Sequence, residues 1–126
     1  MKYLIDSNIL IYNFNGDSVA KEFLKNNLQN SAISIITYTE VLSFDLNDTQ
    51  RDIIENFLKE FIILDVNMTV AKQSIKNRSL KKIKIPDNLI ASTAQVNDLV
   101  LVTRNTKDFK NIDVKLLNIY DESRKT

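Results

Sequence analysis

The sequence predicts an α/β sandwich in which helices flank a mainly parallel β-sheet. Short apolar runs rich in β-branched residues recur along the chain, and segments with the apolar spacing of helices separate them. The runs are too apolar to leave one face of a sheet in water, so helices are expected on both faces, with right-handed crossovers between parallel strands. The length of 126 residues and the absence of a linker-like stretch predict a single domain over residues 1–126.

Short buried strands are predicted from the apolar runs. They cover residues 3–5, 32–35, 62–64, 99–102 and 114–119. Helices are expected where capping residues, or a proline that favours the first helical turn, precede an apolar stripe. Their predicted starts follow Asp17 and Ser18, follow Asn47 and Asp48, and lie at Thr37, near Asn67 and at Pro86. In such a sheet the side chains that do chemistry lie beyond the carboxyl ends of the strands.

The composition excludes several kinds of site. The chain has no Cys and no His, which rules out disulfides, thiolate nucleophiles, Ser-His-Asp triads and imidazole or thiolate metal ligands. Its 17 basic and 16 acidic residues give a net charge of +1, which by itself indicates no polyanionic partner. The first apolar run is interrupted at Asp6, and no uncharged apolar run approaches about 18 residues. Neither a secretory signal nor a membrane span is therefore predicted, and the cytoplasm is the expected location.

Four acidic residues are predicted to lie together at the carboxyl edge of the sheet. Asp6 directly follows the first strand, and Glu40 lies one turn into the helix after the second. Asp87 opens the helix at Pro86, and Asp108 follows the fourth strand by a short turn. The carboxyl ends of parallel strands meet at one edge, so these four carboxylates are able to share it.

Each of these acids also has a structural interpretation as a helix cap. Asp6 is placed to cap a helix that begins at Ser7, and Asp87 to face the positive end of its own helix. Two pairs have the spacing of capping boxes, namely Thr37 with Glu40 and Asn105 with Asp108. A cap contributes about 1 kcal/mol, so capping alone accounts for any single one of the four.

Convergence of the four acids favours a functional explanation instead. Two carboxylates about 4 Å apart repel by about 4 kcal/mol at an effective dielectric constant of about 20, which exceeds the gain from a cap. Either protonation of one carboxyl or a bound cation relieves that repulsion. Oxygen ligands alone select a hard ion such as Mg²⁺ or Mn²⁺, which activates water and neutralises charge on a phosphoryl oxygen. The chemistry implied is hydrolysis of a phosphodiester.

Four segments of the chain give a further indication of fold and function. They are Leu4-Ile5-Asp6-Ser7-Asn8-Ile9-Leu10-Ile11-Tyr12, Thr39-Glu40-Val41-Leu42, Ile85-Pro86-Asp87-Asn88-Leu89-Ile90-Ala91 and Leu101-Val102-Thr103-Arg104-Asn105-Thr106-Lys107-Asp108-Phe109. In content and order they resemble the motifs of PIN-domain nucleases, and among these the VapC-like toxins of toxin–antitoxin pairs. The resemblance implies a PIN-like three-layer sandwich with a five-stranded parallel sheet of order 3-2-1-4-5. It also implies an endoribonuclease that uses Mg²⁺ or Mn²⁺ to cleave single-stranded regions of tRNA or ribosomal RNA.

The resemblance implies roles for individual residues as well. The metal-binding, catalytic acids would be Asp6, Glu40 and Asp87, with Asp108 as a fourth, weaker one. The supporting residues would be Thr103 and Asn105, which hold water or metal, and Ser7 and Asn8, which orient Asp6. Some relatives carry Asp at the position of Asn105, and many carry Thr at that of Ser7.

The partners implied by the resemblance are an RNA substrate, a small antitoxin and a second copy of the chain. The antitoxin's C-terminal segment would cover or enter the acidic pocket. The apolar stripes between Asp17 and Phe61 are best explained as core, and a groove for either protein partner is the alternative. Genome context decides whether such a nuclease is a toxin or an RNA-processing enzyme.

Basic residues are enriched near two of the four acids. Residues 78–110 contain seven basic residues against three acids, Asp87, Asp98 and Asp108. Basic side chains beside a cleavage site suit a phosphate backbone, and ordinary solvated lysines are the alternative. The predicted RNA contacts are Lys82, Lys84, Arg104 and Lys107.

Two other functions fit part of the pattern. Aspartyl-phosphate proteins also place acids at this edge, but the segment after Asp6 lacks the second Asp of a phosphatase nucleophile loop. A PIN fold retained as a non-catalytic RNA-binding or interaction module would keep the same acids. The metal-dependent endoribonuclease is the favoured hypothesis, because it explains the acids and the basic residues together.

Overall fold

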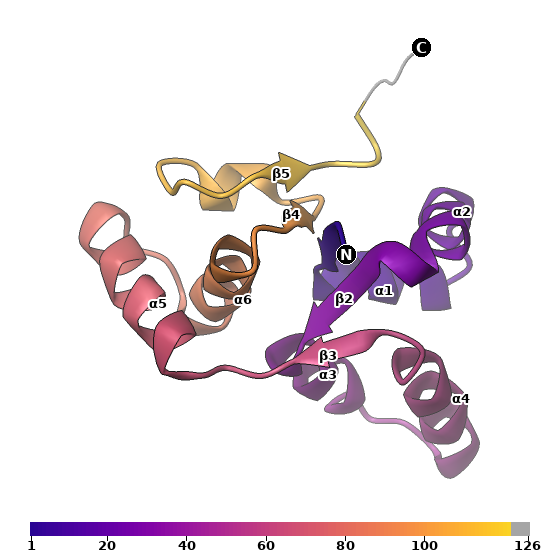
Figure 1. Ribbon diagram of the computed structural model, residues 1–126. Coiled ribbons are helices and arrows are strands. Elements are labelled where there is room, and N and C mark those ends of the chain that lie inside the picture. Colours follow the sequence, from indigo (N-terminus) through magenta and orange to yellow (C-terminus); the bar gives the residue numbers. More distant parts are fainter. Residues whose placement is uncertain (122–126) are drawn as a thin grey trace.

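The computed structural model describes residues 1–121 and contains one five-stranded sheet (Figure 1). Each neighbouring pair of strands is parallel, and the order is β3-β2-β1-β4-β5. The strands are β1 (Tyr3–Ile5), β2 (Ser31–Ser34), β3 (Ile62–Leu64), β4 (Val100–Val102) and β5 (Leu116–Leu117). The predicted α/β class is confirmed, as is the strand order that the family resemblance implied.

Helices cover both faces of this sheet. They are α1 (Ser7–Phe14), α2 (Ser18–Asn27), α3 (Ile35–Leu42), α4 (Asp48–Leu58), α5 (Met68–Leu80) and α6 (Ile85–Val96), with short 3₁₀ turns η1 (Leu28–Asn30) and η2 (Thr106–Phe109). Figure 1 shows α5 and α6 on one side of the sheet and α1, α2 and α4 on the other. No helix among residues 1–121 is long and apolar enough to cross a membrane.

The period-two alternation of strand side chains divides the core into two halves. In β1, Leu4 packs in the cluster that contains Ile90 of α6, whereas Ile5 packs with Ile9 of α1. Both strand residues are fully buried. The central strand is therefore apolar throughout because it faces helices on both sides, as its sequence predicts.

Three of the predicted helix starts are confirmed by their caps. Asp17 accepts a hydrogen bond from the Ala20 N–H at 2.9 Å at the start of α2, and Asn67 accepts one from the Val70 N–H at 3.0 Å at the start of α5. Asn47 forms a complete capping box with Gln50 at the start of α4. At the fifth predicted start, α6 begins at Ile85, one residue before Pro86.

The predicted start of α3 at Thr37 is wrong. Ser34 caps this helix by accepting the Ile36 N–H at 3.0 Å, so the helix begins at Ile35 and β2 ends at Ser34. Thr37 lies inside the first turn and is buried, so it forms no capping box with Glu40. Ser34 and Thr37 are both able to cap a helix, and packing decides between them.

The last strand is shorter than predicted. Only Leu116 and Leu117 of the run 114–119 form β5, which is an edge strand paired with β4 alone. The apolar stripes of α2 and α4 are mostly core, as expected, but Val19 and Ile53 are exposed at 43% and 63%. These two positions leave surface available for another molecule.

A polar contact joins α5 to α6. The Asn77 side-chain amide is buried and donates to Asn88 Oδ1 at 3.0 Å, Ser92 Oγ at 3.0 Å and Gln95 Oε1 at 2.8 Å. The Asn88 amide in turn donates to the carbonyl of Ser74 at 2.8 Å. Because Asn88 is the neighbour of Asp87, this network fixes the helix end that carries Asp87.

Asn77→Leu is expected to destabilise the protein by roughly 1–3 kcal/mol, because it leaves buried acceptors on α6 without their donor at nearly constant volume. Urea unfolding measures the change. Asn56→Leu, on an exposed face of α4, is the matched control and is expected to have little effect. Equal stability of the two variants would show that the network contributes nothing.

Candidate functional site

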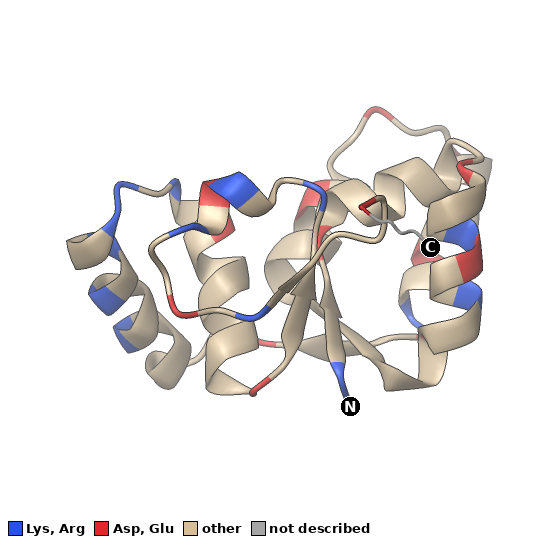
Figure 2. Ribbon diagram, turned by 90° about the horizontal axis from the view of Figure 1, so that it is seen from above, with Lys and Arg blue, Asp and Glu red and all other residues tan. Residues whose placement is uncertain are grey.

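The four predicted acids lie at the carboxyl edge of the central strands. Asp6 follows β1 and caps α1, Glu40 lies on α3, Asp87 lies in the first turn of α6 and Asp108 lies in η2. Figure 2 shows acidic positions beside one another where these elements meet. The edge predicted from the strand ends is therefore where the structure places these carboxylates.

Asp6 is the most perturbed of the four carboxyl groups. Burial raises the pKa of Asp6 to about 6, and the carboxylates of Asp87 and Glu40 add to the rise. Two hydrogen bonds oppose it: the Ser7 N–H donates to Oδ1 at 2.7 Å, and the Thr103 hydroxyl donates to Oδ2 at 2.8 Å. Asp6 is thus a helix cap whose buried carboxyl group has a raised pKa, as carboxyl groups of functional sites often have.

Asp87 is coupled to the other acids. Burial, followed by the negative charges of Glu40 and Asp108, raises the pKa of Asp87, while the Lys84 ammonium opposes the rise. Asp87 therefore lies close enough to three other charged groups to feel their fields. Together with Asp6, it shows that the four carboxylates form one electrostatic unit.

The residues beside Asp6 connect the acids through hydrogen bonds. The Ser7 hydroxyl donates to Glu40 Oε1 at 2.6 Å, so Ser7 contacts Asp6 through its backbone and Glu40 through its side chain. The Asn8 amide lies 3.5 Å from Asp6 Oδ2 and 3.3 Å from Thr103 Oγ1. Thr103 thereby joins the end of β4 to the start of α1.

Asn105 does not act as the predicted cap. Its side chain makes no capping hydrogen bond to η2, and the turn is held by the Asp108 N–H donating to the Asn105 carbonyl at 3.0 Å. The Asn105 N–H donates to Thr103 Oγ1 at 3.1 Å, and the side chain is exposed. The capping box with Asp108 is wrong because the segment forms a 3₁₀ turn, which closes through backbone bonds.

Two buried oxygen atoms in this region have no hydrogen-bond partner within residues 1–121. They are Asn8 Oδ1, on the amide beside Asp6, and Thr37 Oγ1, one turn before Glu40. An unpaired buried oxygen costs free energy, so such groups mark places where water or a ligand is able to bind. The sequence indication of the second atom was the polar residue Thr37 directly after Ile35 and Ile36, but Thr37 was interpreted as a cap.

The donor set fits a hard divalent ion in chemistry and charge. It offers only carboxylate, hydroxyl and amide oxygens, and a cation would relieve the repulsion that raises the pKa values of Asp6 and Asp87. Within residues 1–121, however, no three acidic side chains lie close enough together to hold one ion. Coordination by this set therefore requires side-chain rotation toward a common centre.

Arg104, one residue after Thr103, packs against aromatic side chains. Its guanidinium lies over the rings of Tyr12 and Tyr120, 5.3 Å and 4.6 Å from their centroids. The Tyr120 hydroxyl donates to Asp17 Oδ1 at 3.1 Å, which ties this cluster to the start of α2. The two tyrosines restrict the guanidinium to one position. Sequence reasoning missed this arrangement because Tyr120 is 108 residues from Tyr12 along the chain.

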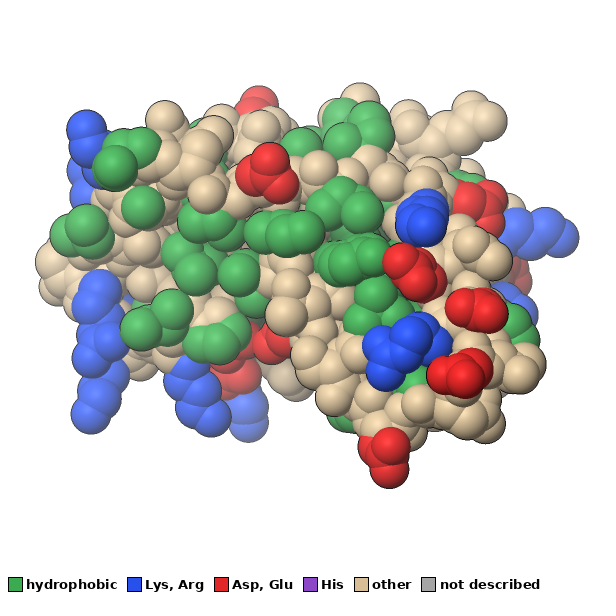
Figure 3. All heavy atoms as spheres, turned by 90° about the horizontal axis from the view of Figure 1, so that it is seen from below, with side chains coloured by type: hydrophobic (Ala, Val, Ile, Leu, Met, Phe, Trp, Pro, Cys, Tyr) green, Lys and Arg blue, Asp and Glu red, His purple; other side chains and the backbone are tan. Residues whose placement is uncertain are grey.

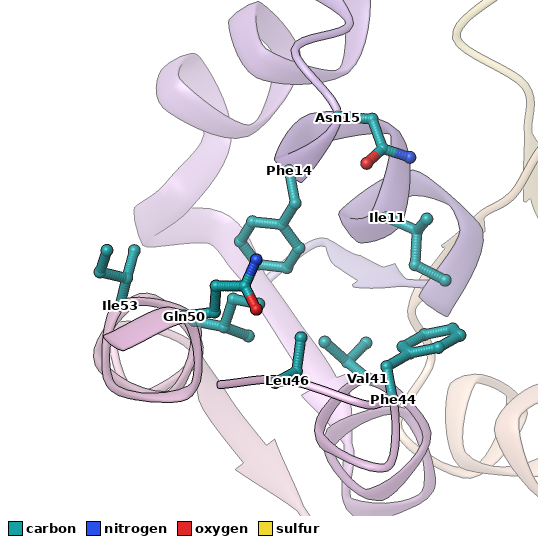
Figure 4. A pocket seen from close by; sticks show the side chains of 9 residues that line it. Ile11, Phe14, Asn15, Val41, Phe44, Leu46, Gln50 and Ile53 are labelled. Carbon is teal, nitrogen blue, oxygen red and sulfur yellow. The ribbon is translucent and has the colours of Figure 1, made fainter. Parts of the chain in front are cut away.

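A separate apolar pocket of about 460 Å³ lies between α1, α3 and α4 (Figure 4). Phe14, Val41 and Phe44 line it, and Ile53 closes one side from α4. None of the four acids lines it. Its chemistry suits apolar side chains, so it is distinct from the acidic site.

Acidification is expected to stabilise the metal-free protein through Asp6. Because the pKa of Asp6 is about 6 in the folded chain and 3.8 ordinarily, the folded state takes up a proton first as the pH falls from about 6 to about 4. The gain is at most about 3 kcal/mol, and Asp6→Asn is expected to lose it. Unfolding in chelator at several pH values measures the difference between the two proteins.

The matched control for this measurement is Asp98→Asn. Asp98 is exposed, and its hydrogen bond and ion pair with Lys115 lower its pKa, so it contributes no stability on acidification. Parallel pH profiles for the wild type and Asp6→Asn would contradict the burial of an ionised Asp6.

Comparison with known proteins agrees with this geometry. The sequence matches the PIN domain over residues 3–115. A chain in a toxin–antitoxin complex from Klebsiella pneumoniae is 37% identical, with 95% of this chain and 99% of that chain covered and a TM-score of 0.85. Comparison with curated proteins gave no match.

Two further solved structures have the same fold. VapBC2 from Rickettsia felis, bound to a DNA fragment from the promoter, is 27% identical, with 94% and 98% of the two chains covered and a TM-score of 0.82. FitAcB from Neisseria gonorrhoeae is 25% identical over 94% and 98%, with a TM-score of 0.81. The match over residues 3–115, the sheet order and these neighbours show that the chain belongs to the PIN domain family.

Proposed function

We propose that this chain is an endoribonuclease that uses Mg²⁺ or Mn²⁺ to cleave single-stranded regions of RNA, and that it is the toxin of a toxin–antitoxin pair. Proteins of the PIN domain family are generally nucleases, and the similar solved structures are toxin–antitoxin complexes. The observation that carries the proposal is the coupling of four carboxylates, two with raised pKa values, at one sheet edge. Structural caps have no need of such repulsion.

The proposed metal ligands and catalytic acids are Asp6, Glu40 and Asp87, with Asp108 beside them. A bound ion supplies an activated water and stabilises negative charge on the phosphoryl oxygen. The Ser7 hydroxyl and the Thr103 hydroxyl hold the Glu40 and Asp6 carboxylates, which would be ligands of a bound ion. Thr103, Asn8 and Asn105 are polar groups placed to bind water next to it.

The proposed substrate contacts are the exposed basic residues of this edge. The Lys84 ammonium acts on Asp87 electrostatically, and Arg104 is fixed by two tyrosine rings. These cations are suited to hold phosphates next to the scissile one, with Lys82 and Lys107 completing the predicted set. Domain 1–126 would then act as one catalytic unit.

A non-catalytic PIN module is the second candidate. The observation that favours it is that no three acidic side chains within residues 1–121 lie close enough to hold one ion. Such a module would bind RNA through the same surface without cutting it. Divalent-ion titration of the protein separates the two candidates, because only the nuclease requires binding.

Asp87→Asn is expected to reduce RNA cleavage by at least about 100-fold, because it removes a metal ligand. A mixed pool of tRNA and ribosomal RNA is incubated with the purified protein and Mn²⁺, with and without chelator. Folding stability is expected to stay equal or rise, because the substitution relieves the repulsion that raises the Asp87 pKa.

Asp113→Asn, an exposed acid near β5, is the matched control and is expected to cleave like the wild type. Cleavage that survives Asp87→Asn or excess chelator would refute the metal-dependent mechanism. A destabilised but fully active Asp87→Asn protein would identify Asp87 as a helix cap only.

The proposed protein partners are an antitoxin and a second copy of the chain. The similar chain from Klebsiella pneumoniae lies in a toxin–antitoxin complex, and the apolar pocket between α1, α3 and α4 suits an amphipathic antitoxin segment. Figure 3 shows further apolar side chains gathered on the face seen from below, and exposed Met68 and Ile85 belong to α5 and α6. Such surface is suited to contact between two copies.

Ile53→Glu is expected to weaken antitoxin binding about tenfold or more, because it places a charge at the rim of the apolar pocket. The product of a short reading frame directly upstream of the gene is co-purified with the chain. Ile75→Glu on α5, where Ile75 is 70% exposed, is the matched control. Equal co-purification of the two variants would exclude the pocket as the antitoxin-binding site. The mass of the complex shows whether it contains two copies of the toxin chain.

A further inference from the structure

One arginine and two tyrosines form a cluster beside the acidic site. We call it the arginine–tyrosine cluster, and it consists of Arg104, Tyr12 and Tyr120. The Arg104 guanidinium lies 5.3 Å from the centroid of the Tyr12 ring and 4.6 Å from that of the Tyr120 ring. The two rings meet edge to face, with their centroids 5.7 Å apart and their planes at 81°. The cluster therefore contains three flat groups in contact, and one of them carries a permanent positive charge.

Two short connections place this cluster next to the acids. Arg104 directly follows Thr103, whose hydroxyl donates to Asp6 Oδ2 at 2.8 Å. Tyr12 lies one helical turn after Asn8 on α1, and the Asn8 amide is 3.5 Å from the same Asp6 oxygen. Residues four apart share one face of a helix, so Tyr12 and Asn8 lie on the same side of α1. The cluster is therefore a direct neighbour of the acidic site.

The Arg104 guanidinium has no acidic partner in the described part of the chain, residues 1–121. Neither of the two ion pairs there includes it, and its N–H groups donate no hydrogen bond there. Asp17 is occupied by other donors, because its Oδ1 accepts the Ala20 N–H at 2.9 Å and the Tyr120 hydroxyl at 3.1 Å. The bond from Ala20 lowers the pKa of Asp17 most, and the Arg104 charge lowers it further. The fold thus leaves the charge and the donors of Arg104 available to another molecule.

The two tyrosines hold the guanidinium at the surface. Tyr12 and Tyr120 are half-buried whereas Arg104 is exposed, so the rings lie beneath the guanidinium and its outer face meets solvent. Tyr120 is itself fixed by its hydroxyl bond to Asp17 and by its N–H, which donates to Asn118 Oδ1 at 3.0 Å. Figure 1 shows the segment after β5 passing toward the side of α1 and α2. Because the plane is already held, a ligand that contacts it has little side-chain entropy to overcome.

An exposed planar cation of this kind suits a flat aromatic ligand. Single-stranded RNA is recognised largely through bases that stack on aromatic rings or on guanidinium planes. A phosphate contact needs only charge, which a lysine supplies as well, whereas a plane supported by two rings is suited to stacking. The carboxylates beside the cluster are the ones proposed to cut RNA. A base of that RNA is therefore the flat ligand that the position of the cluster favours.

We propose that the arginine–tyrosine cluster binds one nucleobase of the RNA strand, stacked on the outer face of the Arg104 guanidinium, next to the phosphate at the acidic site. This inference rests on the proposed function and adds a base contact to it. The N–H groups at the edge of the same guanidinium stay available to a phosphate, because stacking uses only the face of the plane. The cluster thereby favours single-stranded RNA, whose bases are free to stack, over a duplex.

The test measures the contribution of the bases to binding, apart from cleavage. Two fluorescent strands of equal length are titrated with protein in excess chelator: oligoadenylate, and an abasic strand with the same sugar–phosphate backbone. Anisotropy gives the ratio of the two affinities. The wild type is expected to prefer oligoadenylate by roughly fivefold to 150-fold, the range of base stacking on aromatic side chains. Equal affinity of the wild type for the two strands would overturn the proposal.

Arg104→Lys keeps the charge and removes the plane. The preference for oligoadenylate is expected to fall about fivefold or more, while the affinity for the abasic strand stays unchanged. Arg78→Lys on α5 is the matched control, because Arg78 is exposed and makes no ring contact within residues 1–121. It is expected to keep the wild-type preference. An unchanged preference in Arg104→Lys, or an equal loss in both variants, would overturn the proposal.

Tyr120 tests whether the rings support the plane. Tyr120→Leu removes the ring beneath Arg104, whereas Tyr120→Phe keeps the ring and loses the bond to Asp17. The preference for oligoadenylate is expected to fall about threefold or more in Tyr120→Leu, and by less in Tyr120→Phe. Thermal unfolding checks that each variant is folded. A wild-type preference in folded Tyr120→Leu would show that the ring has no part in the site.

Cleavage of RNA by the wild-type protein in Mn²⁺ separates this inference from the proposed function. Cleavage together with an unchanged preference in Arg104→Lys refutes the base contact and leaves the nuclease standing. Loss of the preference in Arg104→Lys without any wild-type cleavage supports the base contact and refutes the nuclease.

Discussion

The buried carboxylate of Asp6 connects the end of β1, the start of α1 and the end of β4. Its ionised form is costly where it lies, since burial raises its pKa to about 6. The Ser7 N–H and the Thr103 hydroxyl reduce that cost, and each comes from a different element. The register of β1 against β4 and the position of α1 therefore both depend on the same small group of atoms.

The sequence presented structural capping and function as alternatives at Asp6; the structure shows the cap, and the proposed function gives the same carboxylate a second role. Its first oxygen accepts the Ser7 N–H at the start of α1, while its second accepts the Thr103 hydroxyl and lies near Asn8. A purely structural cap has no need of other carboxylates close enough to raise its pKa, as Asp87 and Glu40 do here. Natural proteins retain such costly groups where function requires them, and compensate by packing elsewhere. The two fully apolar halves of the core supply that compensation here.

This geometry does not support the interpretation of the chain as an aspartyl-phosphate protein. The segment after Asp6 reads Ser7-Asn8, without the second Asp of a phosphatase nucleophile loop, and the Ser7 N–H and the Thr103 hydroxyl hold the two Asp6 oxygens in place. The pattern suits a carboxylate that is held in place so that its charge is available to a cation.

The sequence predicted those parts of the fold that depend on local chemistry. The apolar runs predicted the positions of the strands. Asp17, Asn47 and Asn67 predicted three helix starts, because a cap depends only on residues within one turn. The start of α3 was missed because Ser34 and Thr37 both carry a hydroxyl group able to cap a helix and both are buried. Only the hydrogen bond from the Ile36 N–H to Ser34 Oγ distinguishes them. The location of the acids at one edge of the sheet could be predicted from the parallel arrangement of the strands alone. Two other contacts could not be predicted from local sequence patterns, because they join residues that are not neighbours in sequence. They are the hydrogen bond from Ser7 to Glu40 and the stacking of Arg104 on Tyr120.

The distance in sequence between Asp6 and Thr103 has a consequence for the chain while it is being made. The two residues are 97 positions apart, and β1 lies in the centre of the sheet with β4 as one neighbour. During synthesis the N-terminal part emerges first. A partly synthesised chain has β1 and β2 but no β4, so its central strand is unpaired on one side and Asp6 lacks its hydroxyl donor. The acidic site is therefore assembled only after β4 and Thr103 have been synthesised, and a chain that ends before them carries Asp6, Glu40 and Asp87 without this arrangement.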